Sequence, residues 1–168
     1  LESAPQLLDG AEKGGYSIQI NPGCGAALFS FNVTHPDMEK RSVYGDIRFR
    51  QAMSMAMNRD EINEVAYYGM GVVEQYTGIS PAPDFISDEM KSYMTQYDPA
   101  AANALLDEIG LSDTDGDGFR ELPSGAPFVM SIDYATQGIG GVEVELVART
   151  LQLICNLLCT SPCKFFCI

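Results

Sequence analysis

The sequence predicts a mixed α/β (α+β) domain, because strand-like and helix-like segments alternate along its 168 residues. Two apolar and aromatic runs, at 27–33 and 128–134, are typical of buried strands. Between them Asp46 precedes apolar residues at helical spacing, and the pair Asp98-Pro99 is a strong helix start. A chain of this length suffices for one domain with a single core.

The other elements follow from the same patterns and from their end signals. We expect Asp60 to cap one helix and Gly110 to end another. The segments 34–45 and 71–96 are polar or irregular and predict loops; a connection as long as the second is usually functional or packs as its own layer. In chain order, the sequence predicts strands at 16–20, 27–33 and 128–134, and helices at 47–57, 61–68, 100–109 and 142–153.

The composition narrows the range of partners. Lys and Arg number 10 against 23 Asp and Glu, which gives a net charge of −13. Such a field repels nucleic acid phosphates and anionic membrane surfaces, so we expect no nucleic acid partner. No apolar run reaches the roughly 18–20 residues of a membrane span, so we expect no direct membrane insertion. The start at Leu1 lacks a signal segment, which fits a mature protein or an excised piece.

The five cysteines are unevenly placed. Acidic residues vanish near Gln152, and four cysteines then recur at every fourth residue: Cys155, Cys159, Cys163 and Cys167. We interpret 1–150 as the domain and 151–168 as a Cys-rich tail foreign to it, such as a shifted reading frame or a cloning scar. A zinc or redox role is the alternative, although zinc sites usually pair cysteines around a turn and no His lies near.

An acidic loop matches the opening of a calcium-binding loop. Alternating Asp residues with Gly at the sixth position, here Gly118, wrap several oxygens around one ion. The twelfth position holds Ser124 instead of a bidentate Glu, so a hydrogen-bonded Asx turn is the alternative. The candidate calcium ligands are Asp113, Asp115, Asp117 and Glu121.

Motifs for catalysis are missing from the sequence. His35 is the only histidine, and no Gly-x-Ser-x-Gly, His-Glu-x-x-His or P-loop pattern occurs. The pair Gly23 and Gly25 begins like a dinucleotide fingerprint, but a strand-like segment follows where a helix is needed. We therefore expect a protein that is not an enzyme and has no cofactor, calcium excepted.

Three stretches are ordinary alone but specific in their order and spacing. The first runs from an apolar segment through the helix after Asp46, the second is the helix after Asp98, and the third is the acidic loop with its following strand. They comprise 28–32, 46–52, 56–62, 68–71, 97–110, 113–118 and 125–134. In this order they resemble the peptide-binding, family-five extracellular solute-binding proteins of bacteria, over roughly residues 25–150.

This resemblance implies a partial lobe of a periplasmic-binding-protein type II-like fold, within a two-lobed protein that closes on a solute. It implies capture of peptides or similar small solutes for an ABC importer, with permease subunits as partners. The location would be the periplasm or the extracellular face of the membrane, as in a lipoprotein or secreted protein whose signal or anchor is not in this chain. A calcium-stabilised structural domain without a transport ligand is the alternative function.

The resemblance also implies where a ligand would bind. In this family the loop after the third strand often lines the cleft, and some members carry a basic anchor for the ligand carboxylate there. Here 135–141 holds no Arg or Lys, which argues against a simple dipeptide-type carboxylate site. The candidate ligand-binding residues are Asn32, Tyr134, Thr136 and Gln137.

Overall fold

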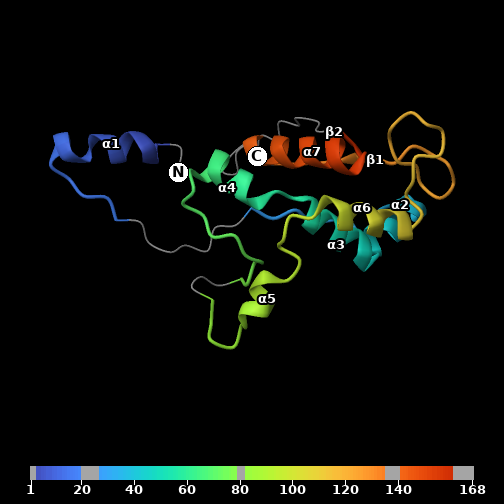
Figure 1. The fold of residues 1–168 in the computed structure, drawn as a ribbon, viewed down its shortest axis with the longest axis horizontal. Helices are drawn as coiled ribbons and strands as arrows, with labels where there is room; N and C mark the ends of the chain where they lie inside the picture. Colours follow the sequence, from blue (N-terminus) through green and yellow to red (C-terminus); the bar gives the residue numbers. More distant parts are fainter. Residues whose placement is uncertain (1–2, 20–26, 79–81, 135–140, 161–168) are drawn as a thin grey trace.

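The computed structural model describes residues 3–19, 27–78, 82–134 and 141–160. Within them, helices predominate around one small sheet (Figure 1). Helix α7 lies with the two strands, α3 and α6 lie beside them, and α1 projects to one side. The elements are α1 (Ala4–Gly14), α2 (Met38–Gly45), α3 (Ile47–Ala56), α4 (Arg59–Tyr67), α5 (Asp88–Ser92), α6 (Pro99–Glu108), β1 (Val129–Ser131), α7 (Gly141–Cys155) and β2 (Leu158–Thr160).

The two strands and α7 form a βαβ unit. Strands β1 and β2 pair in parallel, with Val129 opposite Leu158 and Ser131 opposite Thr160. Parallel neighbours need a crossover connection, and α7 is the helix of that connection. The carboxyl ends of both strands therefore lie at the same edge of the sheet, where Tyr134 follows β1.

Helices α3 and α6 begin where the sequence predicts. Asp46 Oδ1 accepts the amide N–H of Arg48 at 2.8 Å, and Asp98 Oδ1 accepts that of Ala101 at 2.9 Å. Each bond satisfies a donor that the first helical turn leaves unpaired. After α6, Gly110 has a φ of +82°, a left-handed conformation that glycine adopts without strain. Local signals thus define both helices.

Aromatic rings from four segments form the centre of the core. Phe49 on α3 is fully buried and meets Phe31 edge-on, with ring centroids 5.2 Å apart. Its centroid lies 5.7 Å from that of Tyr44 on α2 and 5.9 Å from that of Phe128, which precedes β1. Beside these rings α3 packs on α6 through small or aliphatic residues that are fully buried: Ala52, Ala56, Ala102 and Leu106.

Two helix starts differ from the sequence-based expectation. The prediction of a loop over 34–45 is wrong, because α2 occupies most of that segment. The side chain of Asp37 accepts hydrogen bonds from the amides two and three residues further on, and this cap outweighs the polar composition. Helix α4 begins two residues earlier than predicted, because Asn58 Oδ1 accepts the amide of Glu61 where Asp60 was expected to cap.

The predicted strands are shorter in the structure or are not formed. Strand β1 covers three residues of 128–134. The described residues of 16–20 and 27–33 belong to no ladder, so the strand prediction is wrong for them. A strand is stabilised by a ladder of hydrogen bonds to a neighbouring strand, and the described part of the chain forms no such ladder with these residues. Within 71–96, the structure adds the short helix α5.

The Cys-rich end packs on the core as far as it is described. Helix α7 continues to Cys155, and both Cys155 and Leu157 are fully buried. Strand β2 follows at once and pairs with β1. Packing does not reveal origin, so the division at residue 150 and the foreign nature of 151–168 stay predictions.

Candidate functional site

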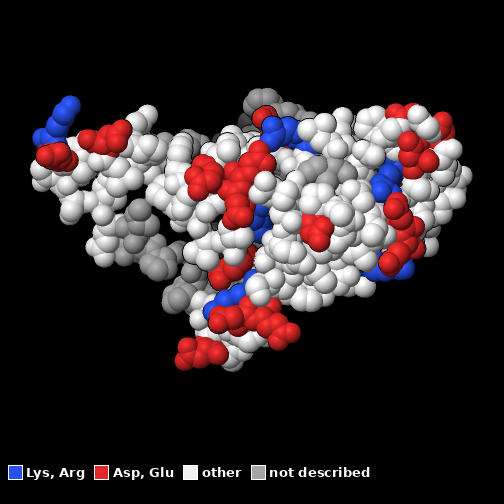
Figure 2. Space-filling view, viewed as in Figure 1, with Lys and Arg blue, Asp and Glu red and all other residues white. Residues whose placement is uncertain are grey.

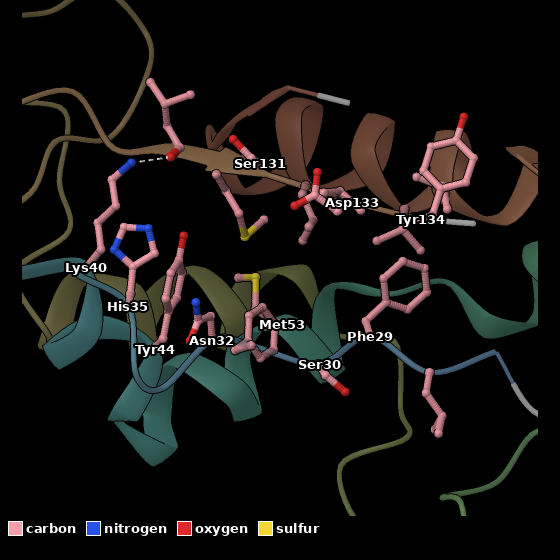
Figure 3. Close-up of a pocket in the computed structure, with 18 of the residues that line it drawn as sticks. Phe29, Ser30, Asn32, His35, Lys40, Tyr44, Met53, Ser131, Asp133 and Tyr134 are labelled. Carbon is pink, nitrogen blue, oxygen red and sulfur yellow. Dashed lines mark hydrogen bonds between the residues drawn. The ribbon is translucent and has the colours of Figure 1, made fainter. Parts of the chain in front are cut away.

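A cavity of ≈ 660 Å³ lies between the extended segment 27–32 and the segment that contains β1. Figure 3 shows these two walls on opposite sides of the space, with Met53 of α3 between them. Phe29 lies across from Tyr134, whereas Asn32 lies nearer to Ser131 of β1, so the two walls run in opposite directions. The volume falls within the usual range for small-molecule sites.

Two of the predicted ligand-binding residues line this cavity. Asn32 comes from the first wall and Tyr134 from the second, although about 100 residues separate them. The other two, Thr136 and Gln137, lie outside the described residues. Whether any of the four contacts a solute stays a prediction.

The side chain of Asn32 already takes part in a local turn. Its Oδ1 accepts hydrogen bonds from the amide of Thr34 at 3.1 Å and from the hydroxyl of the same residue at 2.9 Å. This is the turn that short polar side chains form with the backbone two residues on. A ligand at this point would meet the side-chain amide nitrogen of Asn32.

The carboxyl end of β1 gathers an acidic and an aromatic side chain. Asp133 is exposed and Tyr134 is half-buried, and both line the cavity. A Cβ atom at Gly141 would lie 3.5 Å from the hydroxyl oxygen of Tyr134, so this ring lies against the start of α7. In open α/β sheets, ligands bind just outside the carboxyl ends of the strands. This end of the cavity is therefore the part best placed to meet a solute.

Sequence reasoning missed two lining residues on α2. Lys40 Nζ donates a hydrogen bond to the backbone oxygen of Val129 at 2.8 Å, and burial raises the pKa of the Tyr44 hydroxyl. Both lie in the segment predicted as a loop. The N-cap signal of Asp37 could have found them, because a helix begun there brings positions 40 and 44 to one face.

The acidic loop brings its four predicted ligands together. Their candidate ligand atoms lie within 4.8 Å of one another: Asp113, Asp115, Asp117 and Glu121. The carboxylate of Asp113 accepts the amides of Gly116 and Gly118, at 2.7 and 3.0 Å. Glu121 accepts the amide of Thr114 at 2.6 Å. The loop also contains the turns of the Asx-turn alternative, because Asp115 Oδ1 accepts the amide of Asp117 at 3.0 Å and Asp117 Oδ1 accepts that of Phe119 at 2.7 Å. Calcium binding here stays a prediction.

Two of the tail cysteines are free thiols in an apolar setting. Burial raises the pKa of both Cys155 and Cys159 to about 11. Zinc binding and thiol redox chemistry both use the thiolate, which this environment disfavours. Cys163 and Cys167 lie outside the described residues, so the zinc or redox alternative stays a prediction.

We expect Cys155 and Cys159 to be alkylated slowly by iodoacetamide at neutral pH and faster as the pH approaches 11. Their folded pKa values lie above the ordinary value of 9.0, so the neutral thiols stabilise the fold fully below about pH 9. That contribution is lost as the pH rises through about 11. Mass spectrometry of time courses from pH 7 to pH 11 measures both rates. Alkylation at pH 7.5 as fast as in the urea-unfolded chain would contradict the expectation.

On the face of the molecule that Figure 2 shows, acidic side chains are distributed over several elements and do not form a single patch. Figure 2 shows Asp and Glu over α1, α4 and α5 and at the end that carries the acidic loop, with fewer Lys and Arg among them. In the part of the chain that the structure describes, every helix is too short or too polar to cross a bilayer.

Comparison with known proteins gives a consistent set of relatives. Residues 2–154 match the family described as bacterial extracellular solute-binding proteins, family 5 middle. A probable ABC transporter-binding protein of Deinococcus radiodurans is 32% identical over 120 residues, which cover 70% of this chain and 20% of that protein. A periplasmic alpha-galactoside-binding protein of Rhizobium meliloti is 30% identical over 151 residues, 87% of this chain and 19% of the relative.

A solved structure agrees with these relatives. The oligopeptide-binding protein OppA superimposes with a TM-score of 0.71 at 35% identity, over 79% of this chain and 20% of that one. This likeness confirms the predicted fold class, a partial lobe of a periplasmic binding protein.

The relatives are binding proteins, and the family description agrees with the predicted extracellular or periplasmic location. The chain spans about a fifth of the length of these relatives. With residues 2–154 matched, the chain belongs to the bacterial extracellular solute-binding proteins, family 5.

Proposed function

We propose that the protein binds a small solute outside the cytoplasmic membrane and delivers it to an ABC importer. This chain would supply one wall of the solute cleft. The observation that carries the proposal is the cavity between 27–32 and β1, in a chain that belongs to this family. The protein would bind its solute without transforming it, and its partners would be the permease subunits of the importer.

The chemistry of the wall bears on the class of solute. At the carboxyl end of β1, Asp133 can accept hydrogen bonds, and the rings of Phe29 and Tyr134 offer apolar faces. The loop 135–141 has no Arg or Lys to anchor a carboxylate. One relative is named for an alpha-galactoside and another for oligopeptides. We propose that the solute is a peptide or a similar small molecule. Its uncharged groups and its hydrogen-bond donors would contact this wall. No finding favours the calcium-stabilised structural alternative.

We expect Tyr134→Ala to weaken solute binding about tenfold or more, because buried aromatic contacts carry much of the affinity of such sites. Mass spectrometry of solute that co-purifies with the full product of the gene identifies the ligand. Calorimetric titration with that solute, or with a series of oligopeptides and alpha-galactosides, measures the affinity.

Tyr76→Ala is the matched control. Tyr76 is half exposed and does not line the cavity, so its loss should leave the dissociation constant unchanged. Equal affinities of the Tyr134 variant and the parent protein would mean that this wall does not contact the solute. Failure of every peptide and sugar to bind would contradict the proposed function itself.

A further inference from the structure

The two ends of the cavity differ in charge. Asp133 lines it beyond the carboxyl end of β1, whereas Lys40 and His35 line it at the other end (Figure 3). Lys40 Nζ is held by the backbone oxygen of Val129, four residues before Asp133. Four residues of extended chain span about 13 Å, which exceeds the Debye length of about 8 Å at physiological salt. The charge of Lys40 therefore does little to neutralise Asp133.

Among the described residues, no ion pair involves the carboxylate of Asp133. The side chain is exposed, and the salt bridges of this part of the chain lie elsewhere. The sequence holds no Lys or Arg in 14–39 or in 121–148, the stretches that contain the two walls. The net charge of −13 adds a field that attracts cations. A positive group that pairs with Asp133 therefore comes from outside these stretches, and the cavity is where a solute would bring one.

The same end of the cavity offers apolar surface for an aliphatic stem. Phe29 lies on the facing wall across from Tyr134, and Leu28 and Ile132 also line the cavity. Long cationic side chains bury their methylene groups on apolar surface while the charged head stays near water, and a cation is attracted to an aromatic face. A carboxylate beside rings and aliphatic side chains thus fits a cationic group that ends an aliphatic chain.

We propose that Asp133 makes this wall selective for solutes with a basic side group, such as peptides that carry a lysine or an arginine. This inference rests on the proposed function, because it needs a solute in this cavity. The ammonium or guanidinium group would pair with the Asp133 carboxylate, and the aliphatic stem would lie against Phe29. An anionic side group would be disfavoured, because it would meet a carboxylate of like charge.

Calorimetric titration of the full product of the gene with a matched pair of tripeptides tests the selectivity. The tripeptide alanyl-lysyl-alanine and its norleucine counterpart share the same aliphatic stem, and only the first ends it with an ammonium group. We expect the lysyl peptide to bind about tenfold or more tightly, as hydrogen bonds to charged groups allow. Added salt should shrink this preference, because it screens the pairing of two charges.

Asp133→Asn is the test variant, because it removes the charge and keeps the shape of an exposed side chain. It should bring the preference for the lysyl peptide to within about twofold of none. Asp9→Asn on α1 is the matched control: Asp9 is exposed and lies outside the lining, and its loss changes the net charge equally. The preference should survive in this control.

The possible failures separate this inference from the proposed function. Equal affinities of the two peptides for the parent protein would overturn the selectivity and leave the proposed function in place. So would an undiminished preference in Asp133→Asn, or a loss of both peptides from that variant, because a charge-selective residue acts far more on one of them. Binding of alpha-galactosides without either peptide would have the same meaning. Failure of every peptide and sugar to bind would overturn both.

Discussion

Replacing Arg120 by Ala should lower the free energy of unfolding by about 3 kcal/mol, because it leaves buried carbonyl oxygens without a donor. The Arg120 side chain is 8% exposed. Its Nε donates to the backbone oxygen of Cys155 at 2.9 Å, and its Nη1 donates to the backbone oxygen of Leu111. Nη1 also meets Asp107 Oδ1 at 2.5 Å, and Nη2 donates to Asn103 Oδ1 at 3.0 Å. One guanidinium thus ties α6 and its end to α7.

Urea unfolding followed by far-ultraviolet circular dichroism measures this loss. Arg120→Lys should recover little of it, because a single ammonium group cannot reach acceptors on both sides of the planar guanidinium. Arg149→Ala is the matched control: Arg149 pairs with Glu61 at the surface, and exposed pairs contribute about 0–1 kcal/mol. If Arg120→Ala and Arg149→Ala destabilised the chain equally, the buried contacts of Arg120 would carry no special weight.

Replacing Phe49 by Ala should lower the free energy of unfolding by about 3–5 kcal/mol, the usual cost of deleting a fully buried ring. Phe49 has no exposed surface, and its ring contacts those of Phe31, Tyr44 and Phe128. These rings come from α2, α3, the first cavity wall and the start of β1. The loss should therefore also loosen the cavity, which near-ultraviolet circular dichroism of the tyrosines would detect.

Phe85→Ala is the matched control, because it removes the same type of side chain from an exposed position. Phe85 is 78% exposed, so its removal should change the stability by less than about 0.5 kcal/mol. Phe49→Leu keeps most of the volume and should cost about 1–1.5 kcal/mol. A Phe49→Ala variant as stable as Phe85→Ala would contradict the central place of this ring in the core.

The sequence by itself determined the features that depend on near neighbours. Asp46 and Asp98 cap their helices through amides two and three residues away, so the starts of α3 and α6 could be predicted. The order of the three stretches also identified the family, which the match over residues 2–154 confirms. Helix α2 carried a local signal as well, at Asp37, but the polar composition of 34–45 obscured it.

Part of the candidate site could also be predicted. Asn32 and Tyr134 were expected to bind ligand, and both line the cavity. Lys40 and Tyr44 could not be expected there while their segment was predicted as a loop. The hydrogen bonds that Asn32 Oδ1 accepts come from a residue two positions on, so they depend on local sequence. The position of Asn32 across the cavity from β1 depends on the tertiary structure.

Only the tertiary structure decided which strands form and what encloses the cavity. The segment 27–33 has the residues and the burial pattern of a strand, but a ladder needs a neighbour that sequence pattern alone does not supply. The cavity is enclosed by two walls about 100 residues apart in the sequence and by side chains of α3 and α7, among them Met53 and Val147. The contacts of Arg120 likewise join residues from 103 to 155. Capping bonds close within one turn of chain, whereas these contacts exist only once distant segments pack together.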